Sequence, residues 1–482
     1  MIRRESLSAA NRFGLGARPG DLAAMGEPRA WLAAQLQSPP LAAELQGLPD
    51  SLAYLRREAD YQRERRQARQ QAAGDPQQAA QQAQQAAQQA QQAARGLYRQ
   101  AQAQELAARY RVAVSTPAGF AERLVQFWSN HFAVSVDKRA AALYAAPMER
   151  EAIRPHCMGR FADLLLAVER HPAMLRYLDN ANSVGPDSLL AQRAQRRALR
   201  LDPERPVRRL GLNENLAREI LELHTLGVDG GYTQADVTEL ARAITGWGVP
   251  APRDFEQGAP GAAFVFRAPA HAAGSRLVLG RRYAEDGVAQ GEAILAALAR
   301  HPATAQHVSF KLARHFVRDD PPPALVQRMA DAWRRNDGDL RHVYRALIDS
   351  PEAWDAQARK FKPPQDFVVS ALRAGGTWPE APPQQKTVLT LLARMGQPPF
   401  TPRSPAGYAD VAAEWSGADA LWKRVQAAEA LAGMAPGEPL ALAATAFGDG
   451  PDADTLTAVR RAESPREGVA VLLASPAFQW RV

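Results

Sequence analysis

Four places in this sequence carry a histidine or serine followed directly by proline at the end of an apolar helical segment. They are His171-Pro172, His301-Pro302, Ser350-Pro351 and Ser475-Pro476. Proline fixes its own φ, is tolerated at the first helical position and pushes the preceding residue out of the α region, so each pair ends one helix and starts another. Because the pairs are irregularly spaced, they predict a mainly α fold of stacked or bundled helical hairpins and not a solenoid repeat.

The densest group of ionisable residues lies between positions 213 and 247. At about 100° per residue, a helix that begins near Asn213 separates a polar arc from an apolar one. Leu226-Gly227 is expected to end this helix, because glycine adopts the left-handed conformation that closes helix ends. Thr233 and Asp236 then form a carboxylate variant of the capping box for a second amphipathic helix. The segment therefore predicts an αα-hairpin with a polar face on each helix.

Two interpretations of these polar faces remain open. In the first, Glu214 with Arg218 and Arg218 with Glu222 are i,i+4 pairs that stabilise an exposed helix by about 0.2 to 0.5 kcal/mol each, and the spacing alone favours this interpretation. In the second, the carboxylates, asparagines and arginines converge on a ligand or a metal, which would shift their pKa values. The candidate ligand-binding residues of the second interpretation are Asn213, Glu214, Asn215, Arg218, Glu222, Arg242, Trp247, Trp128 and Asn130.

His131 lies in the apolar stripe of a helix for which Thr116 is the expected N-cap and Pro117 the first residue. We expect it to be buried, and a buried neutral histidine usually needs only a hydrogen-bond partner. The alternative is a general base or metal ligand that Asp179 or Glu219 orients. The candidate catalytic residues are accordingly His131, Glu219 and Asp179, and the weak candidates for metal ligands are His131, Glu219 and Glu222.

Asp179 follows the helix that begins near Pro172. A carboxylate there opposes the negative end of the helix dipole and needs a cation or another helix N-terminus nearby. Arg218 or Arg242 is the expected partner. The side chain then either ties two helices together or belongs to the site.

Low-complexity sequence divides the chain. Residues 77 to 94 alternate paired glutamines with alanines at spacings of four and three, which is the heptad seam of a coiled coil. We expect a long surface helix or helical hairpin at about residues 60–105, inserted in a core of residues 1–382 that also carries a basic loop insert at about residues 190–210. Residues 383–482 are expected to form a C-terminal helical region packed on that core.

The region from Gly246 to Tyr283 is rich in glycine and proline and departs from the helical pattern. Phe264-Val265-Phe266 and Leu277-Val278-Leu279 are short runs with strand character. They predict one small β-hairpin element at about residues 264–279.

Composition narrows the classes of function. Cys157 is the only cysteine, which excludes an internal disulfide framework and an all-cysteine metal site. The net charge of +8 comes mainly from arginines spread along the chain, so nucleic-acid binding is not favoured. The sequence has no Gly-x-Ser-x-Gly elbow, phosphate-binding loop, dinucleotide fingerprint or His-Glu-x-x-His helix. No cofactor is therefore predicted, although a divalent metal held by His, Asp or Glu remains open.

The N-terminus carries the basic pair Arg3-Arg4, but no apolar segment of a signal peptide follows it. The apolar run of residues 161–168 is far shorter than the about 20 residues that span a bilayer. We expect a soluble protein without a membrane span and with a cytoplasmic location.

Several phrases of the sequence closely resemble those of the bacterial domain-of-unknown-function family numbered 1800. They are Asn213–Glu219, Tyr232–Asp236, Ala241–Trp247, Phe127–Phe132, His171–Leu175 with Leu178-Asp179, Lys362–Pro364 and Leu473–Phe478. The resemblance covers nearly the whole chain and leaves open that relatives are exported. It implies no activity, because the family is uncharacterised. Such proteins are often encoded beside another uncharacterised family, which implies a possible protein partner encoded nearby.

This chain departs from the family pattern in one loop. The pattern usually has aspartate after the histidine that corresponds to His271, but the residue here is Ala272, and Arg276 stands where lysine is usual. The departure puts in doubt any metal or ligand role of that loop in this chain. His224, where relatives carry an aromatic residue, is assigned to packing.

Three hypotheses follow from the sequence. The first is a helical protein whose polar pocket, formed by the Asn213–Glu219 helix with His131 and Asp179, binds a ligand or a protein partner. The second is a metal-assisted hydrolase that uses carboxylates and His131 to activate water. The third is a structural or assembly protein that engages its partner through the Gln/Ala helix.

Overall fold

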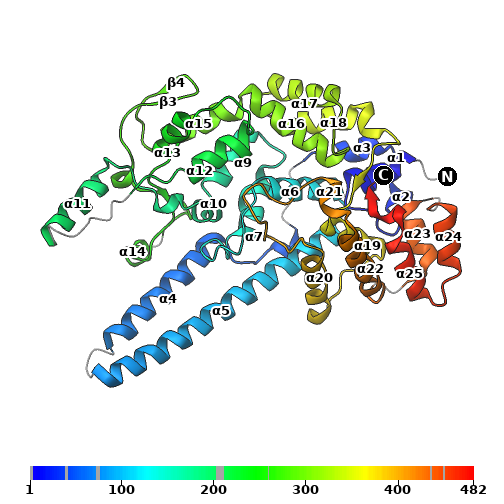
Figure 1. The fold of residues 1–482 in the computed structure, drawn as a ribbon, viewed down its shortest axis with the longest axis horizontal. Helices are drawn as coiled ribbons and strands as arrows, with labels where there is room; N and C mark the ends of the chain where they lie inside the picture. The colour runs from blue at the N-terminus through cyan, green and yellow to red at the C-terminus, as the bar shows by residue number, and fades with distance from the viewer. Residues whose placement is uncertain are drawn as a thin grey trace.

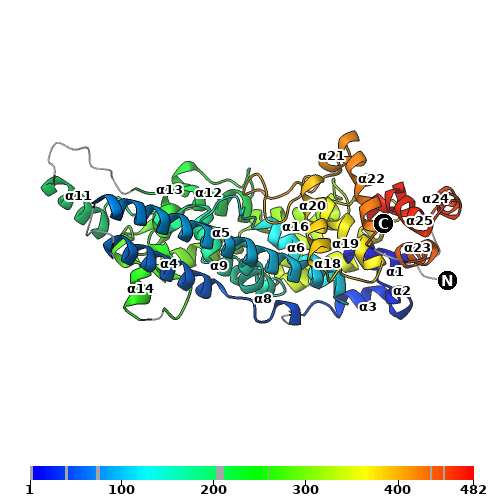
Figure 2. The same ribbon diagram turned by 90° about the horizontal axis from the view of Figure 1, so that it is seen from below.

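The structure, a computed structural model, describes residues 4–37, 42–71, 76–201, 211–258, 260–434, 437–448 and 451–481. These residues form a mainly helical body and three small antiparallel sheets of two strands each. The expected mainly α class is confirmed. The body is elongated, and a pair of long helices projects from it (Figure 1, Figure 2).

The N-terminal segment is a series of short helices. They are α1 (Arg4–Ser8), the π-helical turn η1 (Ala9–Phe13), α2 (Asp21–Ala24), α3 (Pro28–Ala33) and the 3₁₀ turn η2 (Ala43–Leu45).

The projecting pair consists of α4 (Ser51–Gln71) and α5 (Pro76–Ser115), which pack against each other as an antiparallel hairpin (Figure 1). Helix α5 runs through the Gln/Ala stretch and returns to the body. The side chains of the alanine seam lie outside the described part of the chain, so the coiled coil stays a prediction. Toward its C-terminal end, α4 is tied to α14 (Pro252–Glu256) by an ion pair of 2.8 Å between Arg66 and Glu256.

The middle of the body contains the helices that carry most of the sequence motifs. They are α6 (Gly119–His131), α7 (Ala145–Met148), η4 (Glu149–Ile153), α8 (Arg154–His156), α9 (Phe161–Glu169), α10 (Pro172–Tyr177), η5 (Asn180–Asn182), α11 (Leu189–Leu201), α12 (Asn215–Glu219), η6 (Ile220–Thr225) and α13 (Gln234–Ala243). The basic insert expected at residues 190–210 begins within α11, and its residues 202–210 lie outside the described residues.

The strands expected near residues 264–279 exist but pair differently from the prediction. Strand β2 (Val265–Phe266) pairs with β1 (Trp247–Gly248), and β3 (Arg276–Val278) pairs with β4 (Arg281–Tyr283). The 3₁₀ turn η7 (Ala268–Ala270) lies between the two sheets. The small β element is therefore present, but as two sheets of two strands each, because β2 and β3 pair with β1 and β4 and not with each other.

The second half of the chain is helical almost throughout. Its elements are α15 (Val288–Ala299), α16 (Pro302–Phe316), α17 (Pro323–Arg335), α18 (Leu340–Asp349), η8 (Pro351–Trp354), β5 (Lys360–Phe361), α19 (Pro364–Ala374), α20 (Pro382–Arg394), α21 (Ala412–Trp415), α22 (Ala418–Ala432), α23 (Pro439–Phe447), α24 (Ala453–Arg460), α25 (Pro465–Ala474), η9 (Pro476–Gln479) and β6 (Trp480–Arg481). Strand β6 pairs with β5, which brings the end of the described chain back to the body.

The helix starts predicted at the two His-Pro pairs are confirmed by α10 and α16, whereas the two Ser-Pro pairs start only the short 3₁₀ turns η8 and η9. The rings of His171 and His301 also act as caps, because each Nδ1 accepts the backbone N–H two residues later at 3.2 Å. An acceptor at this position satisfies one of the free amides of the first helical turn. The capping box of Thr233 and Asp236 on α13 is present as well.

Buried apolar residues form two clusters. The larger extends from Ala9 to Ala358 and contains α6, α9 and α16. The smaller joins Leu15 and the end of α5 to the helices from α19 to α25. The domain division expected at residue 382 stays a prediction, because shared packing does not show independent folding.

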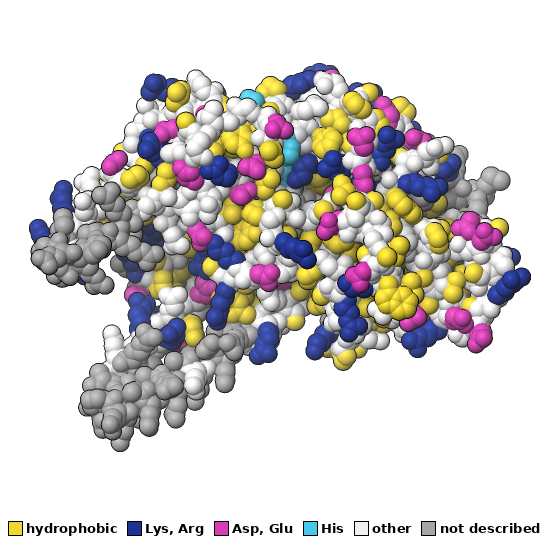
Figure 3. Space-filling model, in the orientation of Figure 1, with side chains coloured by type: hydrophobic (Ala, Val, Ile, Leu, Met, Phe, Trp, Pro, Cys, Tyr) yellow, Lys and Arg dark blue, Asp and Glu magenta, His cyan; other side chains and the backbone are white. Residues whose placement is uncertain are grey.

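In the described ranges, no helix combines the length and the apolar character needed to cross a bilayer. Basic and acidic side chains are interspersed over the face of the molecule in Figure 3.

Candidate functional site

A cavity of about 270 Å³ opens between α6, α16, the start of α19 and the loop of residues 397–410. We call it the polar cavity and this loop the 397–410 loop. The polar lining residues discussed below are Arg109, Arg123, Gln126, Asn130, His131, Lys311, Arg314, His315, Gln365, Asp366, Tyr408 and Asp410.

Helix α6 lines the polar cavity with one face. Arg123, Gln126 and Asn130 recur at spacings of three and four residues, and His131 follows Arg123 by eight, which places all four on one side of a helix. The Gln126 side chain is buried, and its Oε1 accepts from Gln365 Nε2 at 2.8 Å. Its Nε2 has no hydrogen-bond partner among the residues that the structure describes. A buried donor of this kind is costly unless something else satisfies it.

Helix α16 adds two cations without a carboxylate partner. Lys311 is half-buried and forms neither a hydrogen bond nor an ion pair with the described residues. Desolvation lowers the pKa of Lys311 to about 8. Arg314 donates from Nε to the Asp319 carbonyl at 3.0 Å and lies over the Phe310 ring, with 4.4 Å between the guanidinium carbon and the ring centroid. The positive charge on this wall is thus not neutralised by a contacting carboxylate in the described chain.

The 397–410 loop is fixed to α6 through Asn130. The side chain of Asn130 donates to the Tyr408 carbonyl at 2.9 Å and accepts the Tyr408 N–H at 2.8 Å. Gly407 makes this approach possible, because it has a φ of +81° and a Cβ there would lie 2.3 Å from the Asn130 carbonyl oxygen. Asn130, predicted as a ligand-binding residue, therefore builds one wall of the cavity.

Asp410 anchors the end of the same loop. His315 Nδ1 donates to its carboxylate at 2.7 Å, and Lys360 Nζ lies 3.2 Å from the other oxygen. Burial opposes ionisation of Asp410, but His315 and Lys360 outweigh it and hold its pKa below the ordinary value. Desolvation lowers the pKa of His315, so the ring is neutral at pH 7. Its Nε2, buried and without a partner among the described residues, then carries a lone pair.

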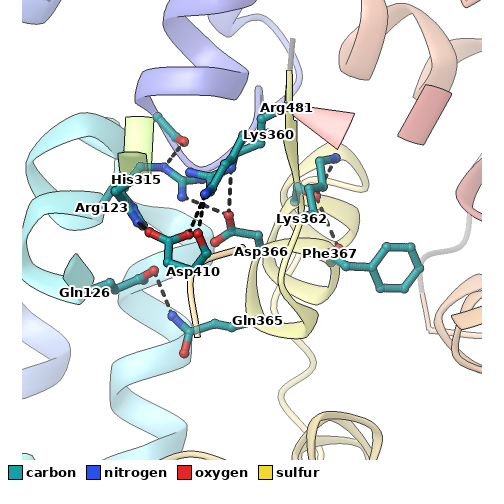
Figure 4. A network of polar contacts seen from close by, with 12 residues as sticks. Arg123, Gln126, His315, Lys360, Lys362, Gln365, Asp366, Phe367, Asp410 and Arg481 are labelled. Carbon is teal, nitrogen blue, oxygen red and sulfur yellow. Dashed lines mark hydrogen bonds and ion pairs between the residues drawn. The ribbon is translucent and has the colours of Figure 1, made fainter. Parts of the chain in front are cut away.

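Asp366, in the first turn of α19, is shared by two buried arginines (Figure 4). Arg123 Nη1 lies 2.9 Å from its carboxylate and Arg481 Nε, from β6, lies 3.2 Å away. Burial opposes ionisation of Asp366, but Arg123 and Arg481 lower its pKa to about 2. Asp366 is thus paired with two arginines within the protein, whereas Asp410 shares Lys360 with Asp319.

His131 is buried as predicted, and the backbone fixes its tautomer. Its Nε2 donates to the His224 carbonyl at 3.2 Å, while its Nδ1 has no hydrogen-bond partner in the described part of the chain. Desolvation lowers its pKa well below the ordinary value, so the ring is neutral. Nδ1 is therefore an acceptor that is left without a partner among the described residues.

The carbonyl that orients His131 comes from a helical irregularity. Helix α12 passes into the π-helical turn η6, where the Leu226 N–H donates to the Leu221 carbonyl at 2.9 Å. The wider turn leaves the His224 carbonyl available to His131. The ring of His224 is buried, as expected, but it also bonds to the buried carboxylate of Glu169 at 2.8 Å.

The polar arc of the Asn213–Glu219 motif lies on the surface of the α12–α13 hairpin. Glu214 is 3.4 Å from Arg218, which is the i,i+4 pair that the spacing favours. Gln234 donates to Glu214 at 2.8 Å, and Thr238 donates to it at 2.7 Å. Asn213 Oδ1 accepts the Asn215 N–H at 2.9 Å and shapes the helix start.

Glu219 and Glu222 are half-buried on the same segment. Burial raises the pKa of Glu219, and Glu222 adds to this effect. Glu222 accepts from the Tyr232 hydroxyl at 3.1 Å. Neither carboxylate lines the polar cavity that contains His131.

Asp179 has a different partner from the one expected. Its carboxylate pairs with Lys138 Nζ at 2.5 Å, and neither Arg218 nor Arg242 contacts it. The prediction that an arginine of the hairpin would compensate it is wrong, because Arg242 is engaged by Glu239 at 2.6 Å. The prediction that the Asp179 carboxylate needs a cation nearby is confirmed, since Lys138 supplies it.

The two tryptophans of the predicted site, Trp128 and Trp247, are buried in the hydrophobic core. Trp128 is fully buried and donates to the Tyr344 hydroxyl at 2.7 Å. Trp247 is buried, and Arg170 lies over its ring at 5.2 Å from the centroid. The polar cavity thus brings together Asn130 and His131 and excludes the other predicted residues, which are Trp128, Asp179, Asn213, Glu214, Asn215, Arg218, Glu219, Glu222, Arg242 and Trp247.

No group of three or more His, Cys, Asp or Glu side chains in the described ranges is arranged to hold a metal ion. The Nε2 of His131 is engaged by the His224 carbonyl of η6, and neither Glu219 nor Glu222 lines the cavity beside this ring. In the loop that departs from the family pattern, His271 bonds to the Thr245 carbonyl at 3.0 Å, and Arg276 bonds to the carbonyls of Ala272 and Ala273.

The family model described as a protein of unknown function, DUF1800, matches residues 8–480. The chain belongs to the DUF1800 family. The match covers α6, α16, α19 and the 397–410 loop, so every wall of the polar cavity lies inside the DUF1800 region. No curated protein and no solved structure matches the chain.

Most cavity residues of this DUF1800 chain lie outside the motifs that single out candidate residues in the sequence. Lys311, Arg314 and His315 have a helical i, i+3, i+4 spacing that could have been found after His301-Pro302. Asp366 lies two residues after the family phrase Lys362-Pro363-Pro364. Asp410 lies in a loop without periodicity, and only the folded chain places it beside His315.

Proposed function

We propose that this DUF1800 protein binds an anionic small molecule in the polar cavity. The observation that carries the proposal is Lys311, a half-buried ammonium group that has no acidic contact among the described residues. Charged side chains in the interior are normally paired, because an unpaired charge loses its hydration without compensation. An anion from outside the chain would complete this wall.

Neighbouring polar groups of the cavity also suit an anionic ligand. Arg314 lies one turn from Lys311 on α16, and its guanidinium contacts no carboxylate in the described part of the chain. The buried Nε2 of Gln126 offers a neutral donor. His131 Nδ1 and His315 Nε2 offer acceptors, which suit a hydroxyl or amine on the same ligand.

The size of the cavity favours a metabolite over a macromolecule. Its volume of about 270 Å³ lies just below the roughly 300 to 1,000 Å³ of pockets for drug-sized ligands. The 397–410 loop, held by Asn130 and Asp410, forms the wall that an entering ligand would contact.

The experiment is thermal unfolding of the full chain with acetate, citrate or inorganic phosphate at several concentrations. A ligand of the native state raises the midpoint as RT ln(1 + [L]/Kd). At least one anion should stabilise the wild type and Lys386→Met, whose lysine is exposed on α20, but not Lys311→Met. Equal stabilisation of all three proteins, or of none, contradicts the proposal.

Two other functions expected from the sequence stay proposals. A metal-assisted hydrolase would retain a divalent ion after purification, which elemental analysis measures. A protein partner of the exposed Glu214–Arg218 surface would be lost on the charge reversal Arg218→Glu, measured by co-purification with the neighbouring gene product.

A further inference from the structure

A second cavity of about 300 Å³ lies on the other side of the 397–410 loop. Apolar side chains of α5, of α7 and of the segment before α7 form most of its wall, and we call it the apolar chamber. They include Ala101, Leu106, Val136, Leu143 and Ala146.

Tyr54 and Glu105, the buried polar residues at the apolar chamber, are engaged within the protein, whereas the polar residues Gln102, Asp137 and Thr401 of its lining are not buried. Glu105 is buried and pairs with Arg150 at 2.8 Å, and the Tyr54 hydroxyl donates to Glu105 at 3.5 Å. Asp137 is exposed to solvent. The inner wall therefore suits an apolar occupant and not a second polar group.

The polar cavity and the apolar chamber share Pro399 and Phe400 as lining residues. Phe400 has a φ of +52°, a conformation that costs free energy for any residue with a side chain. It is held from both sides, because its carbonyl accepts the Val136 N–H at 2.8 Å and its ring lies 5.0 Å from the Arg109 guanidinium. Val136 belongs to the apolar chamber and Arg109 to the polar cavity.

We propose that the ligand is amphipathic, with an acidic head beside Lys311 in the polar cavity and an alkyl tail that passes Phe400 into the apolar chamber. This inference rests on the proposed function and names its ligand class. Pro399 and Phe400 lie between the two chambers, so a tail that leaves the polar cavity past Phe400 would enter the apolar chamber. A strained aromatic residue at that point marks the place where the tail would cross.

The test is a titration of the full chain with straight-chain carboxylates from acetate to decanoate, below their micelle concentrations, followed by NMR or calorimetry. Each methylene that enters the apolar chamber should increase the affinity by up to about fourfold, the value that corresponds to burial of one CH₂ group. The increase should stop when the chamber is full.

Two variants locate the tail. Ala146→Leu extends a side chain into the apolar chamber, and Leu106→Gln places an amide in its wall. Each variant should remove most of the increase in affinity that follows from lengthening the carboxylate, and should leave the affinity for acetate unchanged. Ala162→Leu is the matched control, because Ala162 is a half-buried helical alanine of α9 that lines neither chamber.

The outcomes separate the two proposals. Acetate binding that needs Lys311, with no gain on lengthening the chain, overturns the amphipathic ligand and leaves the anion site in place. A gain that persists in both Ala146→Leu and Leu106→Gln overturns the assignment of the tail to this chamber. Absence of binding by every carboxylate overturns the inference together with the acidic head on which it rests.

Discussion

The side-chain amide of Asn130 pairs with the main chain of Tyr408 as one strand pairs with another, through hydrogen bonds of 2.9 and 2.8 Å. This pairing connects the end of α6 to a loop 278 residues later in the chain. A residue of the Phe127–Phe132 motif thereby holds the wall of the polar cavity.

Asn130→Ala should destabilise the protein and weaken anion binding. Both hydrogen bonds to Tyr408 are lost, and the unfolding free energy should fall by about 1 to 3 kcal/mol because the loop amide and carbonyl lose their partners. Denaturant unfolding measures this loss, and the anion titration measures the change in affinity. A variant as stable as the wild type with unchanged affinity would show that the loop is held by other contacts.

Gly407→Ala tests the same contact from the other side. The new Cβ would meet the Asn130 carbonyl oxygen in a backbone with a φ of +81°, so the loop must move. We expect a loss of at least about 1 kcal/mol, the cost of a strained left-handed residue. Gly261→Ala is the control, because a Cβ there meets nothing within 4 Å, and its stability should stay close to that of the wild type.

Asp366→Asn should be among the most damaging substitutions. It leaves the buried guanidinium groups of Arg123 and Arg481 without their carboxylate, and removal of one member of a buried pair costs about 3 to 5 kcal/mol. The folded-state pKa of about 2 lies below the ordinary value for aspartate. The stability that Asp366 contributes is therefore present above about pH 4 and is lost as the pH falls through about 2. The stabilities of the wild type and the variant should therefore converge as the pH approaches about 2. A difference in stability that does not change with pH would contradict the role of ionised Asp366.

Lys311→Met should leave the protein as stable as the wild type or more stable. The substitution removes a poorly hydrated charge and keeps the length of the side chain. Denaturant unfolding at pH 7 checks this expectation. A loss of several kcal/mol would mean that the ammonium group has a structural partner, and the anion site would lose its main support.

The pH dependence of binding follows from the same residue. Because the pKa of Lys311 is lowered to about 8, anion affinity should fall as the pH rises through about 8. The stability of the ligand-free protein changes with pH in the opposite direction. Between about pH 8 and 10.4 the unfolded lysine, with a pKa near 10.4, binds more protons than the folded one, so the free energy of unfolding rises with pH. Stability of the wild type relative to Lys311→Met should therefore rise over that range. Titrations between pH 6 and 10 measure both slopes, and a pH-independent affinity would exclude Lys311 as the anion contact.

Local sequence rules predicted the helical framework well. Proline position and capping chemistry act over a few residues, so the starts at Pro172 and Pro302 and the box of Thr233 with Asp236 could be read directly. Helix starts were less exact where a cap was ambiguous, since α6 begins at Gly119 and not at Pro117. The π-helical turn η6 has no sequence signature of its own.

The candidate site was harder to predict because it depends on contacts between distant segments. Periodicity showed that His131 is on a buried face, but it could not show that Lys311, Asp366 and Asp410 come to the same place. The site was predicted at the Asn213–Glu219 motif instead, because charged residues are dense in that part of the sequence. In the fold these charges pair mainly with one another at the surface of the hairpin, as Glu214 does with Arg218 and Gln234.

A crystal structure of the complex with the tightest-binding carboxylate is the most direct measurement of the central claim. The account predicts that the acidic group lies within hydrogen-bond distance of Lys311 Nζ, about 2.7 to 3.2 Å, inside the polar cavity. A carboxylate bound elsewhere on the protein, with no contact to Lys311, would contradict it.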